Sequence, residues 1–110
     1  MPKREDSLLL NDIIICIEKI YTYTNNYTFD DFINDEKTID AVVRNFEIIG
    51  EASKLISEET KLANKLIEWR MMTDFRNILI HEYFGVDYKA VWDAIQESLP
   101  YNYEFLKRIA

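Results

Sequence analysis

Apolar side chains recur at spacings of three and four residues through most of this sequence, and that period restricts the fold more than any other feature. Side chains at this spacing lie on one face of an α-helix, so each run is expected to turn one stripe toward a core. The chain has only two glycines and two prolines, residues that strand-rich folds need at their many tight turns. The sequence therefore predicts an all-α fold and argues against an all-β sandwich.

Two long helices are expected in the first half of the chain. Ser7 can cap the first, whose inward stripe comprises Leu10, Ile13, Ile14, Ile17, Ile20 and Tyr21. Phe29 and Phe32 are expected to anchor a short connecting turn. The second helix begins near Asp35, and its expected buried face comprises Ile39, Val42, Val43, Phe46, Ile49, Ala52, Ser53 and Ile56. Gly50 lies inside that face and indicates close approach of another helix, because glycine is unfavourable in a helix interior.

The sequence of the second half of the chain predicts two more helices. Residues 57–64 are charged and lack an apolar face, so we expect a helix end and a loop there. A third long helix is expected from Leu66 to about Glu82, and a fourth after Asp87 that Pro100 closes. Residues 101–109 add a final short turn or helix. The predicted architecture is a single domain, residues 1–110, built as an antiparallel bundle of four to five helices.

Charge and cysteine content restrict location and partners. Twenty acidic and thirteen basic residues give a formal net charge of −7, so RNA or DNA binding requires a local cationic site. Cys16, the single cysteine, cannot form an internal disulfide, and the N-terminal stretch does not have the order of a signal peptide. A cytoplasmic location is expected. No apolar run approaches the ~18 residues of a membrane span, so no membrane contact is expected.

The polar cluster around the single histidine is the candidate site. Arg76, Asn77, His81 and Tyr83 lie within eight positions of one another. On an ideal helix Asn77 and His81 would share a stripe one turn apart, whereas Arg76 and His81 would diverge by about 140°. Their heads can then meet only through the long arginine stem, a loosened helix end, or a second chain.

These residue types suit cleavage of the RNA backbone. His81 can act as general acid or base near neutral pH, and Arg76 can stabilise charge on the non-bridging phosphate oxygens, with no metal or other cofactor. Asn77 can orient the ring or the substrate, and Tyr83 can contact a ribose or base. The alternative is structural: a histidine in the last turn of a helix is favoured by the helix dipole, beside ordinary surface residues.

Other polar and aromatic groups have simpler interpretations. Glu47 and Glu51 lie one turn apart, but two carboxylates without a histidine partner make a poor metal site. Glu51 is expected either to pair with an arginine, for example Arg76, or to face water. The apolar stripe of Trp69, Met72, Phe75 and Trp92 is expected to be core. The cluster of Tyr21, Tyr23 and Tyr27 could stack on bases, although a helix end partly packed on Phe29 and Phe32 is the preferred interpretation.

Three sequence blocks resemble the HepT-like toxins of the HEPN ribonuclease superfamily. Their signature, an arginine, four to six residues, a histidine, one residue and a tyrosine, is matched by Arg76, His81 and Tyr83. Residues 44–52 read RNFEIIGEA and residues 76–87 read RNILIHEYFGVD, followed by VW at 91–92 and LP at 99–100. The resemblance implies a metal-independent endoribonuclease toxin that works as a homodimer, with the motifs of two subunits lining one cleft.

The same resemblance implies a protein partner. Toxins of this family are paired with a minimal nucleotidyltransferase antitoxin that transfers AMP from ATP to the motif tyrosine, here Tyr83. An AMP group adds an anion and a bulky nucleoside beside the cationic centre, which would block an RNA phosphate. Toxin and antitoxin could also join in a larger hetero-oligomer. The alternative function is a non-catalytic helical subunit that docks such a nucleotidyltransferase.

Overall fold

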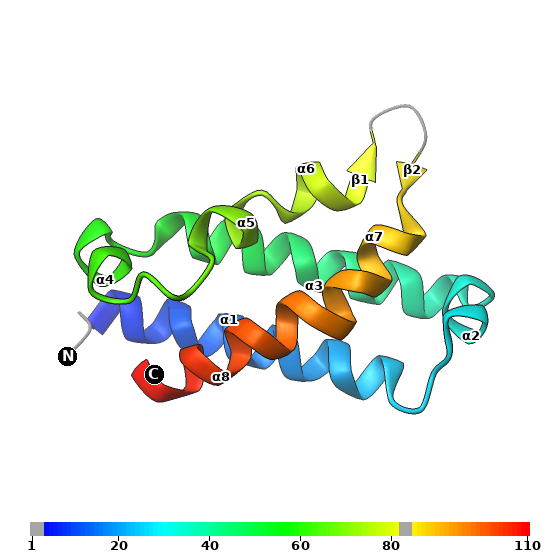
Figure 1. Cartoon of the computed structure of the whole chain (residues 1–110), viewed down its shortest axis with the longest axis horizontal. Coiled ribbons are helices and arrows are strands. Elements are labelled where there is room, and N and C mark those ends of the chain that lie inside the picture. Colours follow the sequence, from blue (N-terminus) through cyan, green and yellow to red (C-terminus); the bar gives the residue numbers. More distant parts are fainter. Residues whose placement is uncertain (1–3, 82–84) are drawn as a thin grey trace.

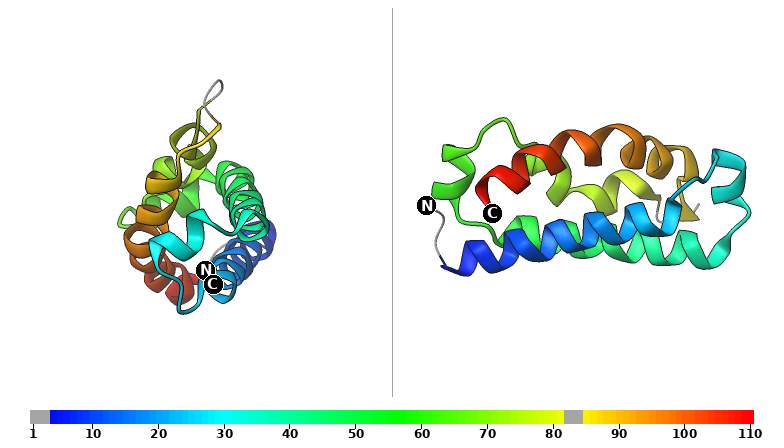
Figure 2. Two further views of the ribbon diagram at one scale, coloured as in Figure 1. Left: turned by 90° about the vertical axis from the view of Figure 1, so that its right-hand side faces the viewer. Right: turned by 90° about the horizontal axis from the view of Figure 1, so that it is seen from below.

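A computed structural model of the chain describes residues 4–81 and 85–110. Two long antiparallel helices, α1 (Arg4–Thr24) and α3 (Glu36–Leu55), lie side by side (Figures 1 and 2). The helices of the second half pack on this pair, and their apolar side chains form one core with it. The described elements are helical apart from one two-stranded ribbon, so the all-α prediction is confirmed.

The helix α1 extends further toward the N-terminus than the sequence indicated. Its described part begins at Arg4, and Glu5 and Asp6 lie in the first turn, where acidic groups favour the helix dipole. Asp6 is buried and accepts hydrogen bonds from the backbone and hydroxyl of Ser57 and from the hydroxyl of Thr60. The stripe expected to face inward does so, with Leu10, Ile13, Ile17 and Ile20 fully buried.

The connection between the long helices contains a short helix, α2 (Phe29–Ile33). Thr28 caps it, and Asp31 completes a reciprocal capping box with the Thr28 backbone. Phe32 is fully buried, and its ring centre lies 5.5 Å from that of Trp92. The predicted anchoring of this connection by phenylalanine is therefore confirmed.

Gly50 of α3 allows another helix to approach closely, as predicted. A Cβ atom on Gly50 would lie 3.2 Å from the carbonyl oxygen of Thr73 and 3.3 Å from that of Met72. Few real Cβ contacts are so short, so α3 and α5 (Trp69–Thr73) can pack this closely because residue 50 has no side chain. The rest of the predicted buried face of α3 is confirmed.

The prediction of a loop at residues 57–64 was wrong. This segment contains α4 (Glu58–Ala63), which Ser57 caps through a hydrogen bond from the backbone of Thr60. Thr60 is the one buried residue of α4, so the helix has no repeating apolar positions from which the sequence could predict it. Capping and the acidic first turn define this helix instead.

The prediction of a third long helix from Leu66 to about Glu82 was also wrong. The chain forms α5, then α6 (Phe75–Leu79), then the strand β1 (Ile80–His81), which pairs antiparallel with β2 (Gly85–Val86). A tight turn at Asp74 separates the two helices, and Ile80 has an extended backbone that ends α6. Leu66 is 64% exposed, so it does not belong to the buried stripe.

Pro100 does not close the fourth helix. The helices α7 (Tyr88–Asp93) and α8 (Leu99–Ile109) are joined by a π-helical turn, η1 (Ala94–Ser98), and the backbone stays helical at both junctions. Pro100 lies in the first turn of α8. There a missing N–H is tolerated, which corrects our interpretation of this proline as a stop signal.

We refer below to α4, α5, α6, β1 and β2 together as the segmented edge. In Figure 1 α4 lies beyond the left end of α3, and α5 and α6 follow toward the right along α3. The ribbon projects from the bundle in Figure 1 and in the left view of Figure 2. None of the helices within the described ranges is long and apolar enough to cross a membrane.

Candidate functional site

Arg76 lies on α6 with its side chain 68% exposed. Its Nη1 atom donates a hydrogen bond to Oε2 of Glu47 on α3, at 3.0 Å. Glu47 is half-buried at 31% exposure, so it is the more fixed member of the pair. The sequence left two alternatives for Glu51, an ion pair with an arginine such as Arg76 or exposure to water. Glu51 is exposed, and Glu47 is the partner of Arg76.

The close contact at Gly50 explains why Glu47 is the partner. Gly50 touches the backbone of Thr73, and α3 runs antiparallel to the chain of α5 and α6. Glu47 lies three residues before Gly50, and Arg76 lies three residues after Thr73. One helical turn away from the contact, these two side chains therefore face each other. Sequence reasoning missed the pair, although the glycine was the signal that could have placed it.

A hollow of about 440 Å³ surrounds this ion pair. It is bounded by α3, α5 and α6, and we call it the Arg76 hollow; its lining residues are Arg44, Glu47, Ile48, Gly50, Glu51, Thr73 and Arg76. Arg44 is exposed, so the hollow presents two guanidinium groups and two carboxylates. Guanidinium groups bind phosphate oxygens through paired donors, and Arg76 is held in place by a single bond to Glu47.

His81 is placed by its backbone alone. It is the second residue of β1, where it pairs with Gly85, while its side chain lies outside the described residues. Tyr83 and the neighbouring Glu82 also lie outside them. The expected alignment of Asn77 and His81 on one helical stripe was wrong, because α6 ends at Leu79 and the chain is extended from Ile80. The sequence offered three ways to bring Arg76 and His81 together: the long arginine stem, a loosened helix end, or a second chain. The structure contains a helix end between the two residues, at Leu79.

Asn77 follows Arg76 on α6 and is exposed. Its side chain is therefore accessible to solvent, although Asn77 is not among the residues that line the Arg76 hollow. The role of Asn77 in orienting a substrate or a ring stays a prediction.

The apolar and acidic candidates have structural explanations. Trp69, Met72 and Phe75 are buried, as expected for core residues, and Trp92 is half-buried against Phe32. Within residues 4–81 and 85–110, no group of three or more acidic, histidine or cysteine side chains is arranged to hold a metal ion.

Two of the three clustered tyrosines are engaged inside the fold. Burial raises the pKa of Tyr21 to about 12, and its ring packs edge-on against Tyr103. Tyr27 donates a hydrogen bond to Asp35, which raises the pKa of the phenol and lowers that of the carboxyl. Only Tyr23 of this cluster is exposed. Base stacking by all three is therefore not supported, and packing near the helix end explains this cluster.

A comparison with known protein families identifies the family to which the chain belongs. A family described as "Ribonuclease HepT-like" matches residues 13–109, which include Arg76, His81 and Tyr83. The chain belongs to the ribonuclease HepT-like family. The resemblance drawn from three sequence blocks is thereby confirmed.

Archaeal relatives agree with this family assignment. A protein of Thermococcus cleftensis named "Probable ribonuclease HepT" is 45% identical over 98 residues, 89% of this chain and 89% of that protein. A protein of Methanocaldococcus jannaschii named "Putative RNase MJ0127" is 37% identical over 109 residues, 99% of this chain and 90% of that protein. No solved structure matches the chain.

Proposed function

We propose that this HepT-like protein is a metal-independent endoribonuclease toxin that uses Arg76 and His81 to cleave the RNA backbone. The observation that carries the proposal is the exposed guanidinium of Arg76, held by Glu47 in a hollow on the segmented edge. His81 follows five residues later, beyond the helix end. The family match supports a ribonuclease, and this geometry supports the choice of residues.

The proposed reaction is an internal transfer at phosphorus. A base removes the proton of a ribose 2′-hydroxyl, and the oxygen attacks the adjacent phosphorus while the bond to the 5′-oxygen breaks. The departing oxygen takes up a proton, so the products are a 2′,3′-cyclic phosphate and a 5′-hydroxyl. His81 acts as the general base or acid. Arg76 stabilises the charge on the non-bridging oxygens.

Glu47 occupies only part of the Arg76 guanidinium. A guanidinium carries five N–H donors, and the bond to Glu47 involves one nitrogen, Nη1. The remaining donors are available to two phosphate oxygens, which is the paired geometry that arginine favours. Asn77, exposed beside Arg76, orients the substrate in this proposal, and Tyr83 contacts it.

We further propose that the active form is a homodimer in which the Arg76 and His81 motifs of two subunits line one cleft. The ribbon that carries His81 projects from the bundle, so a second copy can reach it (Figure 2). The partner in this proposal is a nucleotidyltransferase antitoxin that attaches AMP to Tyr83, alone or in a larger complex. The added anion would occupy the site of an RNA phosphate.

Cleavage of RNA in the presence of EDTA tests the catalytic proposal. Protein without AMP should cut RNA, and Arg76→Ala or His81→Ala should each reduce the rate at least about a hundredfold. Arg108→Ala, which removes an exposed arginine from α8, is the matched control and should keep full activity. A wild-type protein that binds a nucleotidyltransferase but cuts no RNA would instead favour a non-catalytic docking subunit.

Intact mass tests the modification. Protein produced together with the nucleotidyltransferase should carry AMP, and Tyr83→Phe should not. Tyr83→Phe should weaken the substrate contact of Tyr83, but co-expression should no longer silence whatever RNA cleavage the variant retains. An adduct that persists in Tyr83→Phe would place the modification elsewhere.

A further inference from the structure

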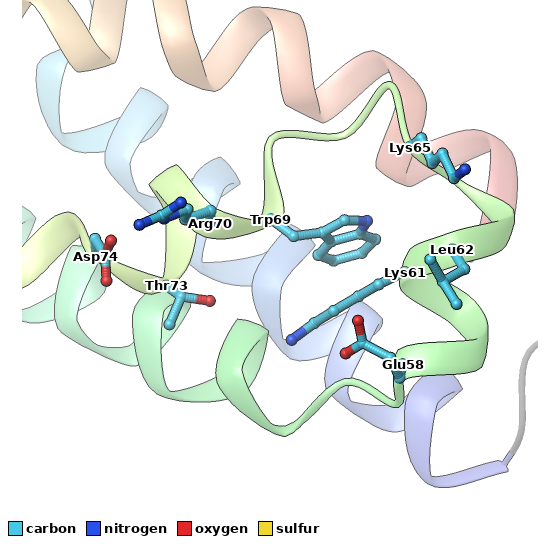
Figure 3. A pocket seen from close by; sticks show the side chains of 8 residues that line it. All are labelled: Glu58, Lys61, Leu62, Lys65, Trp69, Arg70, Thr73 and Asp74. Carbon is cyan, nitrogen blue, oxygen red and sulfur yellow. The ribbon is translucent and has the colours of Figure 1, made fainter.

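A second hollow lies beside the Arg76 hollow, between α4 and α5 (Figure 3). Its volume is about 560 Å³, which is enough for part of an extended polymer. Three basic side chains line it, Lys61, Lys65 and Arg70, together with the carboxylates of Glu58 and Asp74. We call it the cationic hollow, because its basic groups outnumber its acidic groups in a chain whose net charge is −7.

The basic groups of this hollow are available to a ligand. Lys65 and Arg70 are exposed, and Lys61 is half-buried. Within the described part of the chain, none of the three forms an ion pair, although Arg76, Lys89 and Lys107 all do. These three unpaired cations outnumber the two carboxylates of the hollow, so the hollow attracts a polyanion more strongly than the acidic chain as a whole does.

The indole of Trp69 lines the cationic hollow and limits which parts of a ligand the hollow can contact. This ring is 8% exposed, and its Nε1 donates a hydrogen bond to the carbonyl of Asn64 at 3.1 Å. Figure 3 shows the Lys61 side chain running past the Trp69 ring. A ring held in this way offers no open face for a base to stack on, so the ligand contacts are those of phosphates.

The two hollows adjoin each other on the segmented edge. Thr73, the last residue of α5, lines both of them. Arg70 lies on α5 and Arg76 on the next helix, α6, so a strand entering the Arg76 hollow across Thr73 passes Arg70. Lys61 lies further along the same path, on α4.

We propose that the cationic hollow binds the phosphodiester backbone of RNA on one side of the linkage that is cut. It holds the strand through Lys61, Lys65 and Arg70 without selecting bases. The inference rests on the proposed ribonuclease function and adds to it a binding surface outside the catalytic motif. The substrate is therefore a single strand long enough to cover both hollows.

Binding to RNA that cannot be cut tests this surface separately from catalysis. A 20-nucleotide 2′-O-methyl strand has no attacking hydroxyl, so fluorescence anisotropy on the wild-type protein measures affinity alone. Lys61→Gln/Arg70→Gln should weaken binding about tenfold and reduce the slope of log affinity against log salt by about 1.4. Lys19→Gln/Lys37→Gln removes the same charge from exposed sites on α1 and α3, and should leave both quantities near the wild-type values.

Affinity, partner binding and cleavage distinguish the possible results. Unchanged affinity for the 2′-O-methyl strand, or equal losses in the two double variants, would overturn the proposal. So would loss of nucleotidyltransferase binding with RNA affinity intact, because the surface would then belong to a protein partner. A wild type that shows the expected binding pattern but cuts no RNA would overturn the catalytic proposal and support this one.

Discussion

The pair α1 and α3 and the segmented edge bury side chains equally well, yet they differ in continuity. The paired helices run for 21 and 20 residues, whereas α4, α5 and α6 have five or six residues each. Ile17 and Ile49 in the pair are fully buried, and so is Met72 in the edge. Apolar spacing therefore reports burial, and it does not report whether the helix continues between the buried positions. Arg76 lies two residues after the break at Asp74, and His81 lies just beyond the end of α6.

The largest expected effect tests how firmly the segmented edge is attached to the pair. Phe75 is 1% exposed, and its ring centre lies 4.9 Å from that of Phe46 on α3. Phe75→Ala should lower the free energy of unfolding by about 3–5 kcal/mol, because it removes this contact and leaves a cavity. Urea denaturation measures the loss. Ile78→Ala, on the same helix but 41% exposed, should cost less than about 1 kcal/mol. Equal losses would show that burial does not govern this edge.

A smaller effect is expected where the edge is fixed by a polar contact. Asn102 is fully buried on α8, and its Oδ1 accepts a hydrogen bond from the backbone N–H of Glu68 at 2.8 Å, just before α5. Asn102→Ala should cost about 1–3 kcal/mol, because that N–H loses its partner. Amide hydrogen exchange should show faster opening of α5 than of α1. Gln96→Ala, an exposed change in η1, is the control, and an equal loss there would contradict the assignment.

The start of α3 should respond to acid through Asp35. Hydrogen bonds from Tyr27 and Thr38 lower the pKa of Asp35, which also caps α3. Its contribution to stability is full above the unfolded pKa of about 3.9 and disappears as the pH falls through the lower folded value. The difference in melting temperature between the wild type and Asp35→Asn should therefore narrow below about pH 4.

A double-variant comparison checks the cause of that response. Asp35→Asn should cost less in a Tyr27→Phe background than in the wild type, because the phenol is the first contributor to the lowered pKa. Equal costs in the two backgrounds, measured at neutral pH by thermal denaturation, would show that the two groups are not coupled.

The smallest expected effect on stability is at the candidate site itself. The Arg76 side chain is 68% exposed, and ion pairs at such positions contribute little because water screens them. Arg76→Ala should change the free energy of unfolding by less than about 1 kcal/mol in the same urea titrations. A loss above about 2 kcal/mol would mean that this arginine supports the fold, and lost cleavage in the variant could then reflect unfolding.

Some parts of the fold could be predicted from individual residues. The buried stripes of α1 and α3 followed from apolar spacing, the start of α3 from Asp35, and the close helix approach from Gly50. The breaks at Asp74 and Ile80 could not be predicted in this way, because the buried positions on either side keep a helical spacing. The prediction at Pro100 failed because a proline in the first turn of a helix and one that ends a helix have the same local sequence signal.

The sequence alone determined the apolar stripes that α1 and α3 bury, that the chain is helical, and which family its three blocks indicate. These properties depend on the local period of apolar residues and on residue identity. Tertiary structure alone decided that Glu47, rather than Glu51, holds Arg76. It also decided that Lys61 and Arg70 line a hollow that adjoins the Arg76 hollow at Thr73. Such pairings depend on how α3, α4 and α5 cross and in which register. That geometry is set by close packing between segments distant in the chain.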